Sequence, residues 1–207
     1  TFLFFNILSF CCYSQISVSE NFDDPDIAYD IPDGWTTDDA WFGYLTYVSD
    51  SFSCSGDQAF NANLYEDSPY GVIETPNYQG TLTTALNVSY NLLILDYYEE
   101  TPVDYNFGNI ELLYSTDNGG SWISLGSKNS SNFTSTSSCQ TVSYTINQGV
   151  LNSGGTIKFK FDMEWNEGDF IFFIDDFVIN QSATASVSDL NKDNLRLYPN
   201  PTSEILN

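Results

Sequence analysis

Asp169-Phe-Ile-Phe-Phe-Ile-Asp-Asp-Phe-Val-Ile179 is an apolar run broken only by two adjacent aspartates. Apolar residues fill both sets of alternate positions in this run, which is typical of a central strand that is covered on both faces. Upstream, Thr156-Ile-Lys-Phe-Lys-Phe-Asp162 alternates strictly between apolar and charged residues. Its isoleucine and two phenylalanines are therefore predicted to face a core, while its charged residues face water.

Shorter runs of the same kind fill residues 15–181, and Gly, Asn and Asp separate them. Residues 86–98 form the longest of them. Residues 109–115 and 121–125 are joined by Asp117-Asn-Gly-Gly120, which is a strong hairpin signal. No long stretch has helical periodicity. About ten short strands of this kind predict an all-β domain over residues 15–181, folded as a two-sheet antiparallel jelly-roll sandwich.

The two ends of the chain differ in composition from this domain. Residues 1–14 are an apolar block that is too short to span a bilayer, and we predict that they are part of a secretory signal peptide. Residues 182–192 form a polar linker. Residues 193–207 resemble the start of a type A C-terminal sorting domain of type IX secretion substrates, here truncated. The motif residues are Leu197, Tyr198, Pro199, Asn200 and Pro201. The resemblance implies the type IX secretion machinery as a partner and a secreted or bacterial cell-surface location.

The chain is strongly acidic, with 5 Lys and Arg against 28 Asp and Glu and a net charge of −23. Such a surface repels phosphate backbones and anionic lipids, so no nucleic-acid partner is expected and anionic membranes are disfavoured. No segment beyond the first block is apolar and long enough for a membrane span. The acidity serves either solubility in salty water or the binding of divalent cations.

The chain contains no His. Ser-His-Asp catalysis, Cys-His catalysis and His-based zinc sites are therefore excluded. Glycoside hydrolysis needs only two carboxylates, and Glu164 and Glu167 form a candidate pair. Their odd spacing points them to opposite faces of a strand, and residues 166–168 are typical of a turn. We therefore predict that the chain is not an enzyme, with a glycosidase that uses Glu164 or Glu167 as an alternative.

Ser115-Thr-Asp117-Asn-Gly119-Gly-Ser-Trp122 matches the Asp-box pattern of sialidase propellers. A propeller needs several copies of its repeat, and this chain has one. We therefore predict a structural hairpin, in which Asp117 caps the turn, Gly119 adopts a positive φ and Trp122 packs beneath them.

Two cysteines remain after the predicted signal peptide, and both lie in Ser-rich stretches. In an exported protein such a pair predicts one disulfide, here between Cys54 and Cys139. The bridge would close a long loop and stabilise the fold by about 4 kcal/mol. The alternative is two unpaired thiols.

Asp175 and Asp176 interrupt the apolar strand. Adjacent strand residues point to opposite faces, so at least one carboxylate faces the interior or a sheet end, where an unpaired charge is costly. The first predicted strand ends in a second acidic cluster, and pairing of the first and last strands would bring the clusters together. We predict a structural Ca²⁺ site, and its candidate ligands are Glu20, Asp23, Asp24 and Asp176, with Asp57 and Asp175 as further ligands. The alternative is that Asp175 accepts backbone N–H groups or lies at a solvated strand end.

A series of weak motifs spans residues 19–181, and it includes Asn21-Phe-Asp-Asp24, Ile31-Pro-Asp-Gly-Trp35 and Glu74-Thr-Pro-Asn77. In this order the motifs resemble the MAM-like jelly-roll modules of the choice-of-anchor J and cleaved-adhesin type. The resemblance implies a jelly-roll sandwich, often with bound Ca²⁺. Such modules adhere to proteins or glycans, or accompany a secreted hydrolase. The acidic insertion at residues 23–33 departs from the short loop of that pattern.

Aromatic side chains are the remaining candidates for ligand contact, because their faces stack on sugar rings and anchor protein interfaces. The candidate ligand-binding residues are Trp35, Trp41, Tyr105 and Trp165, and the alternative for each is ordinary core packing. We therefore predict a secreted, non-catalytic, calcium-stabilised module that binds a glycan or an extracellular protein at the cell surface. The alternative is an accessory domain of a larger type IX-secreted peptidase or glycosidase.

Overall fold

The computed structural model describes residues 15–24, 26, 30–37, 46–49, 51–80, 84–151 and 155–181, with only the backbone of 46–49. The predicted signal peptide, linker, sorting motif and Trp41 lie outside the described residues. None of the residues that the structure describes forms a helix with the length and hydropathy of a membrane span.

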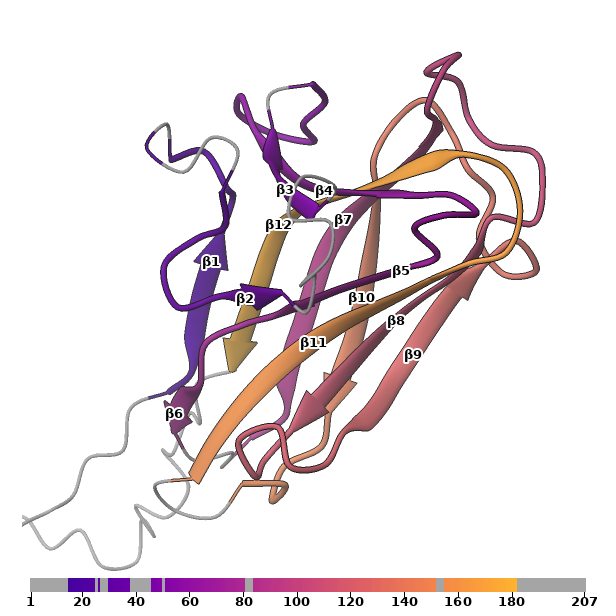
Figure 1. The fold of residues 1–207 in the computed structure, drawn as a ribbon. Coiled ribbons are helices and arrows are strands. Elements are labelled where there is room, and N and C mark those ends of the chain that lie inside the picture. Colours follow the sequence, from indigo (N-terminus) through magenta and orange to yellow (C-terminus); the bar gives the residue numbers. More distant parts are fainter. Residues whose placement is uncertain are drawn as a thin grey trace, which may run out of the picture.

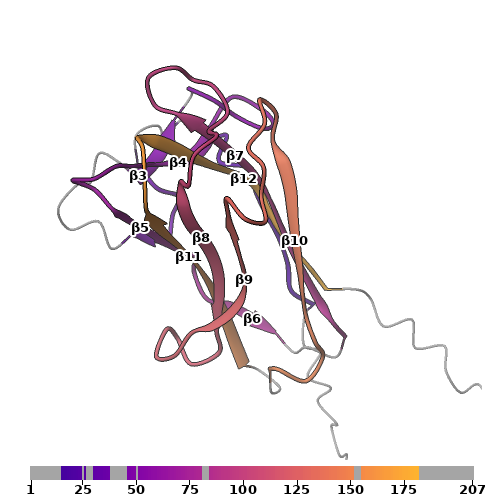
Figure 2. The ribbon, with the colours of Figure 1, turned by 90° about the vertical axis from the view of Figure 1, so that its right-hand side faces the viewer.

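The described chain is built from β-strands that pair in two antiparallel sheets, as the alternating sequence pattern predicted (Figure 1). The strands are β1 (Ser17–Glu20), β2 (Thr36–Thr37), β3 (Thr46–Ser49), β4 (Ala59–Leu64), β5 (Tyr70–Glu74), β6 (Tyr78–Gly80), β7 (Leu86–Asp96), β8 (Gly108–Ser115), β9 (Ile123–Asn129), β10 (Gln140–Ile146), β11 (Gly155–Trp165) and β12 (Phe170–Gln181). Figure 2 shows the two sheets as facing layers, so the predicted all-β sandwich is confirmed.

Each sheet is organised around one long strand near the C-terminal end of the domain. The first, here called the β12 sheet, has the order β10-β7-β12-β4-β3, and β1 also pairs with β12. The second, the β11 sheet, has the order β2-β5-β11-β8-β9, and β6 also pairs with β11. The apolar run at residues 169–179 and the alternating run at residues 156–162 therefore lie in the two central strands. The predicted pairing of the first strand with the last is also present, from Ser17 opposite Asn180 to Glu20 opposite Phe177.

Aromatic rings from the two central strands fill the space between the sheets. Phe177 of β12 lies 5.8 Å from Phe159 and 5.7 Å from Phe161 of β11, measured between ring centroids, and both contacts are edge-on. Tyr90 of β7 meets Phe161 at 4.9 Å. Such edge-to-face pairs add to the stabilisation from burial.

Trp35 belongs to this core. Its side chain is only 5% exposed, and its ring contacts those of Phe22 and Phe177. The loop before β2 turns inward because the Trp35 N–H donates to the carbonyl of Pro32. The prediction that Trp35 is a ligand-binding residue is therefore wrong, because the indole offers almost no face to solvent.

A β-bulge interrupts β12 where it pairs with β7, between Asp175 and Val178. Asp176 has a φ of 48° there, a left-handed conformation that Asp tolerates better than most residues. Before the bulge Ile174 faces the core, and after it Phe177 does, three residues later rather than two or four. The extra residue keeps apolar side chains inward on both sides of the bulge and places two carboxylates at the bend.

The hairpin between β8 and β9 has the predicted structural role. Asp117 accepts hydrogen bonds from the Ser121 N–H at 2.8 Å and from the Ser115 hydroxyl at 2.7 Å, and these hydrogen bonds lower the pKa of Asp117 to about 2. Gly119 has a φ of 89°, and its N–H donates to the Ser115 hydroxyl. Trp122 packs against this turn, since a Cβ added at Gly119 would lie 3.6 Å from the indole.

Candidate functional site

Residues 51–58, which lead into β4, run over the outer face of the β12 sheet and are here called the cover loop. Phe52 of this loop meets Phe173 of β12 edge-on, with ring centroids 5.3 Å apart. Leu93 and Leu95 of β7 complete a small apolar cluster, against which Ile171 and Cys139 also pack. The cluster is separate from the main core between the sheets, so this outer face holds a second apolar layer.

A disulfide between Cys54 and Cys139 ties the cover loop to the start of β10. The Cα atoms lie 5.6 Å apart, and the bridge joins residues separated by 85 positions. The pairing is the one that the sequence predicted.

Asp175 holds the cover loop from the β12 bulge. One of its carboxylate oxygens accepts the N–H groups of Cys54 and Ser55, at 2.8 and 3.0 Å, and the other accepts the N–H of Asp176 at 2.7 Å. Its side chain is fully buried, and this burial raises the pKa of Asp175 above the ordinary value. Asp176 accepts the Ser55 hydroxyl at 2.7 Å and the Asn91 side-chain amide at 2.8 Å.

Asp23 holds the same loop from the opposite side. Its carboxylate accepts the N–H groups of Asp57 and Gln58, at 2.7 and 3.0 Å, and the side-chain amide of Asn21 at 2.7 Å. Gly56 lies directly beneath it, with a φ of 59°, and an added Cβ would meet the Asp23 carboxylate at 1.9 Å. The acidic groups after β1 and within β12 therefore converge on one loop, as the pairing of first and last strands predicted.

The converging groups are satisfied by N–H and O–H donors. Glu20 and Asp24 accept the N–H groups of Phe22 and Asp26, two residues further along the chain. Across the residues with described positions, no three His, Cys, Asp or Glu side chains gather in a way that could hold a metal ion. Calcium binding would need several of these carboxylates as ligands, and it stays a prediction.

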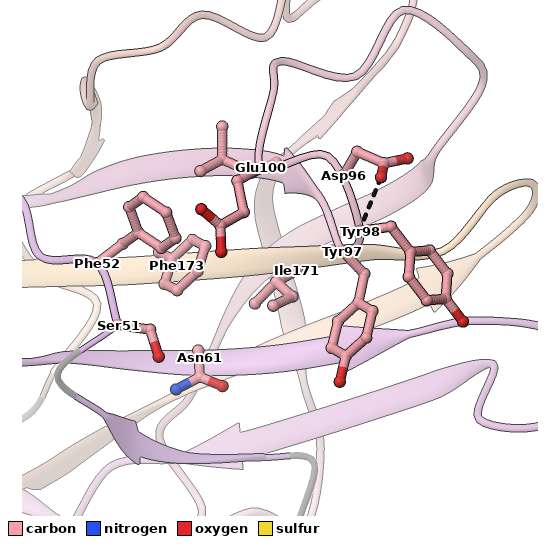
Figure 3. A pocket seen from close by; sticks show the side chains of 10 residues that line it. Ser51, Phe52, Asn61, Asp96, Tyr97, Tyr98, Glu100, Ile171 and Phe173 are labelled. Atoms are coloured by element: carbon pink, nitrogen blue, oxygen red, sulfur yellow. Dashed lines mark hydrogen bonds between the residues drawn. The ribbon is translucent and has the colours of Figure 1, made fainter.

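A pocket of about 360 Å³ opens beside the apolar cluster, at the edge of the cover loop (Figure 3). Its floor is apolar and its rim is polar and aromatic. The lining residues are Ser51, Phe52, Asn61, Leu95, Asp96, Tyr97, Tyr98, Glu100, Ile171 and Phe173. We call it the tyrosine pocket.

The turn that follows β7 sets the rim. The Asp96 carboxylate accepts the N–H groups of Tyr98 and Glu99, at 2.9 and 3.0 Å, and the Glu100 N–H donates to the Asp96 carbonyl. This turn leaves Tyr97 46% exposed and Tyr98 77% exposed, with their ring centroids 5.1 Å apart and their planes perpendicular. In Figure 3 the Glu100 side chain points toward Phe173 and Ile171, and the Tyr97 ring lies on the other side of Ile171.

Tyr105 supports the tyrosine pocket from behind and does not line it. Its hydroxyl shares its one proton between the Asp96 carboxylate at 3.2 Å and the Asp169 carbonyl at 3.1 Å. Its ring covers Gly168 so closely that a Cβ there would meet the ring at 2.2 Å. Burial and the nearby Asp96 raise the pKa of Tyr105. The sequence predicted that Tyr105 contacts a ligand, whereas in the structure Tyr105 has a supporting role behind the pocket.

Trp165 ends β11 and remains partly exposed, in a second depression described below. The turn predicted at residues 166–168 is present between β11 and β12, and both Glu164 and Glu167 are exposed beside it. The sequence missed Phe52, Asn61 and Glu100 as pocket residues. The Tyr97-Tyr98 pair at the end of the longest predicted strand is the signal that points to the rim, whereas only the fold brings Phe52 there.

The chemistry of the tyrosine pocket suits a sugar. Exposed phenol rings stack on the apolar faces of pyranose rings, and an apolar floor with few polar groups fixes the orientation of a small ligand. A carboxylate, here that of Glu100, accepts from hydroxyl groups.

No protein-family model and no curated protein matches the sequence. Solved structures do match. The K1 cleaved adhesin domain of Lys-gingipain from Porphyromonas gingivalis W83 is 12% identical, with a TM-score of 0.55 over 81% of this chain and 99% of that chain. The CBM22-1 xylan-binding domain of Xyn10C from Paenibacillus barcinonensis is 10% identical, with a TM-score of 0.50 over 83% of this chain and 99% of that one.

An enzyme shares the same architecture. The Stig cyclase Fisc from Fischerella sp. TAU is 13% identical, with a TM-score of 0.56 over 81% of this chain and all of that chain. At such identities the likeness shows the fold alone, and this fold carries both binding and catalysis. The cleaved adhesin domain has the sandwich fold that the sequence resemblance implied. The resemblance to the choice-of-anchor J type stays a prediction.

Proposed function

We propose that this protein is a non-catalytic module that binds a neutral glycan in the tyrosine pocket. The single observation that carries the proposal is the pair of exposed, perpendicular tyrosine rings at the rim of a pocket with an apolar floor. The fold is also that of a xylan-binding domain and of an adhesin domain.

The expected ligand is uncharged. The chain carries a net charge of −23, and Glu100 and Asp96 line the pocket itself. Uronic acid units or sulfated sugars would place like charges together, which opposes their binding.

We expect the module to act outside the cell. The disulfide between Cys54 and Cys139 is typical of an oxidising compartment. The signal-like residues 1–14 and the sorting motif at residues 197–201 support export by the type IX machinery. A structural calcium ion is a further proposal, and it predicts a higher thermal midpoint with Ca²⁺ than with a chelator.

Titration calorimetry with neutral oligosaccharides (glucans, xylans, galactans and mannans), with uronic acid and sulfated chains for comparison, tests the ligand. Tyr98→Ala should weaken the best ligand about tenfold, because one stacking surface is lost. Tyr70→Ala is the matched control, since Tyr70 lies on β5 in the other sheet and is 66% exposed. An equal loss in both variants, or binding only to an extracellular protein, would contradict the proposal.

A further inference from the structure

A second depression lies on the outer face of the β11 sheet, where β8 begins and β9 and β11 end. Its volume is about 380 Å³, and its lining residues are Asn106, Gly108, Asn109, Asn129, Glu164, Trp165 and Asn166. It shares no lining residue with the tyrosine pocket. We call it the amide pocket.

The polar wall of the amide pocket is a cross-strand row. Glu164 of β11 lies opposite Asn109 of β8, and Asn109 lies opposite Asn129 of β9. Residues directly opposite in antiparallel strands share a face, with neighbouring strands about 4.8 Å apart. One carboxylate and two amides therefore point the same way at a spacing comparable to the length of one pyranose ring.

The aromatic edge of the amide pocket is held in place. The Trp165 indole N–H donates to the Gly168 carbonyl at 2.8 Å, and its backbone N–H donates to the Pro69 carbonyl. Opposite Trp165 stands Gly108, with a φ of 112°, where an added Cβ would meet the Glu164 carbonyl oxygen at 2.0 Å. Only glycine permits this close approach of β8 to β11.

Hydrogen bonds also orient the remaining amides. The Asn166 side chain donates to the Asn106 carbonyl at 3.2 Å, and the Ser130 hydroxyl donates to the Asn106 side-chain oxygen at 2.9 Å. The Asn129 side-chain oxygen accepts the Ser131 N–H at 3.0 Å. The polar groups of this pocket are therefore preorganised, which lowers the entropic cost of binding.

The β11–β12 turn separates the two pockets. Its Gly168 carbonyl accepts the Trp165 indole on one side, and its Asp169 carbonyl accepts the Tyr97 N–H on the other. The Tyr105 hydroxyl also donates to the Asp169 carbonyl. Both pockets thus lie beside one turn, at one end of the sandwich.

We infer that the amide pocket is a second sugar-binding site, recognising a neutral saccharide unit through the Glu164, Asn109 and Asn129 row and the edge of Trp165. The Asn109 amide offers both a donor and an acceptor to sugar hydroxyls, and the carboxylate accepts from two adjacent hydroxyls. The Asn129 amide offers its NH2 group as a donor, because its oxygen already accepts the N–H and the hydroxyl of Ser131. The inference rests on the proposed function for the ligand class, but it uses a separate set of residues.

Heteronuclear NMR titration of the whole chain with the same neutral oligosaccharides tests the inference. We expect two groups of ligand-shifted signals, one at residues 96–100 and one at the Trp165 indole with the Asn109 and Asn129 side-chain amides. Asn109→Ala should weaken binding at the second group about tenfold and leave the first unchanged. Tyr98→Ala should do the reverse.

Asn87→Ala is the matched control, because Asn87 is an exposed β7 residue whose amide oxygen accepts the Thr145 hydroxyl outside both pockets. Signals that shift only at residues 96–100 would overturn the inference and leave the proposed function standing. Signals that shift only around Trp165 would support the inference and contradict sugar binding in the tyrosine pocket. No shift at either group would overturn both.

Discussion

The two outer faces of the sandwich are built differently: one is apolar and covered by a loop, and the other carries charged residues. On the β12 sheet, Phe173, Leu93 and Leu95 point outward, and the cover loop shields them with Phe52. On the β11 sheet, the outward positions of the central strand are charged. Lys158 pairs with Glu74 of β5, and Lys160 pairs with Asp162 at 3.0 Å while lying 5.0 Å from the centre of the Trp122 ring.

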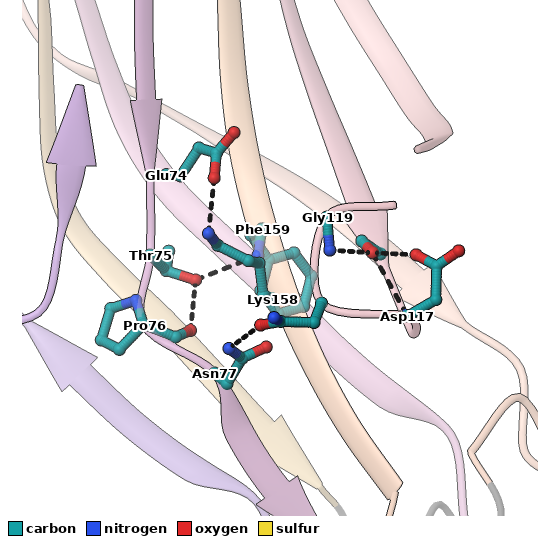
Figure 4. A network of polar contacts seen from close by, with 10 residues as sticks. Glu74, Thr75, Pro76, Asn77, Asp117, Gly119, Lys158 and Phe159 are labelled. Atoms are coloured by element: carbon teal, nitrogen blue, oxygen red, sulfur yellow. Dashed lines mark hydrogen bonds and ion pairs between the residues drawn. The ribbon is translucent and has the colours of Figure 1, made fainter. Parts of the chain in front are cut away.

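Figure 4 shows a network of polar contacts around Lys158 of β11 and Thr75, the residue that follows β5. Lys158 reaches Glu74 across the sheet, and the Thr75 hydroxyl accepts the Phe159 N–H and donates to the Pro76 carbonyl. The first two contacts join β11 to residues 74 and 75, at the end of β5 and just after it. Single ion pairs near the surface contribute little to stability, whereas an apolar layer stabilises only while it stays covered. The cover loop has no regular secondary structure. It nevertheless covers the apolar layer of the β12 sheet and also lines the tyrosine pocket.

Removal of the disulfide should give the largest loss of stability, and this loss belongs to the covered face of the β12 sheet. Cys139→Ala, or reduction of the bridge, should lower the free energy of unfolding by about 4 kcal/mol, because the unfolded chain gains the freedom of a long loop. Urea titration measures the loss. Lys160→Ala on the other face should change the same free energy by less than about 1 kcal/mol. Equal effects on the two faces would contradict our view of the cover loop.

A substitution at Gly56 should destabilise the cover loop while the disulfide stays intact. Gly56→Ala places a Cβ against the Asp23 carboxylate and forces a left-handed residue, so we expect a loss of about 2 kcal/mol in a urea titration. Gly149→Ala is the control, because Gly149 has a φ of 85° but nothing within 4 Å of an added Cβ. If both variants lose the same amount of stability, the contact between the added Cβ and the Asp23 carboxylate has no effect on stability.

The pH dependence of Asp175 should give the smallest effect. Burial raises its pKa above 3.8 in the folded state, so the stability it contributes is present below about pH 4 and is lost as the pH rises through the folded-state pKa. Between about pH 4 and 7, the wild type should therefore lose stability relative to Asp175→Asn, which does not titrate. Urea titrations across this range measure the difference. A relative gain with rising pH would show that the N–H donors outweigh burial.

The sequence predicted those features that arise from local patterns. Strict alternation placed β11, and the turn residues 166–168 separated it from β12. The acidic runs predicted that the two chain regions meet, since pairing of the first and last strands brings Asp23 and Asp175 to one place. The partners of these carboxylates could not be predicted, because they are backbone N–H groups, which every residue carries. Nor could the burial of Trp35, which depends on the path of residues 31–35 over the sandwich.

The pairing of β1 with β12 has a consequence for how the protein is made. A ribosome releases β12 only after almost the entire domain, and until then Ser17–Glu20 has no partner strand. The central strand of the β12 sheet is likewise the last to emerge, so until then β4 can pair with β3 and β7 with β10, but the two halves of the sheet are not joined. Contacts between such distant segments form slowly. The β12 sheet is therefore completed only after nearly the whole domain has been synthesised.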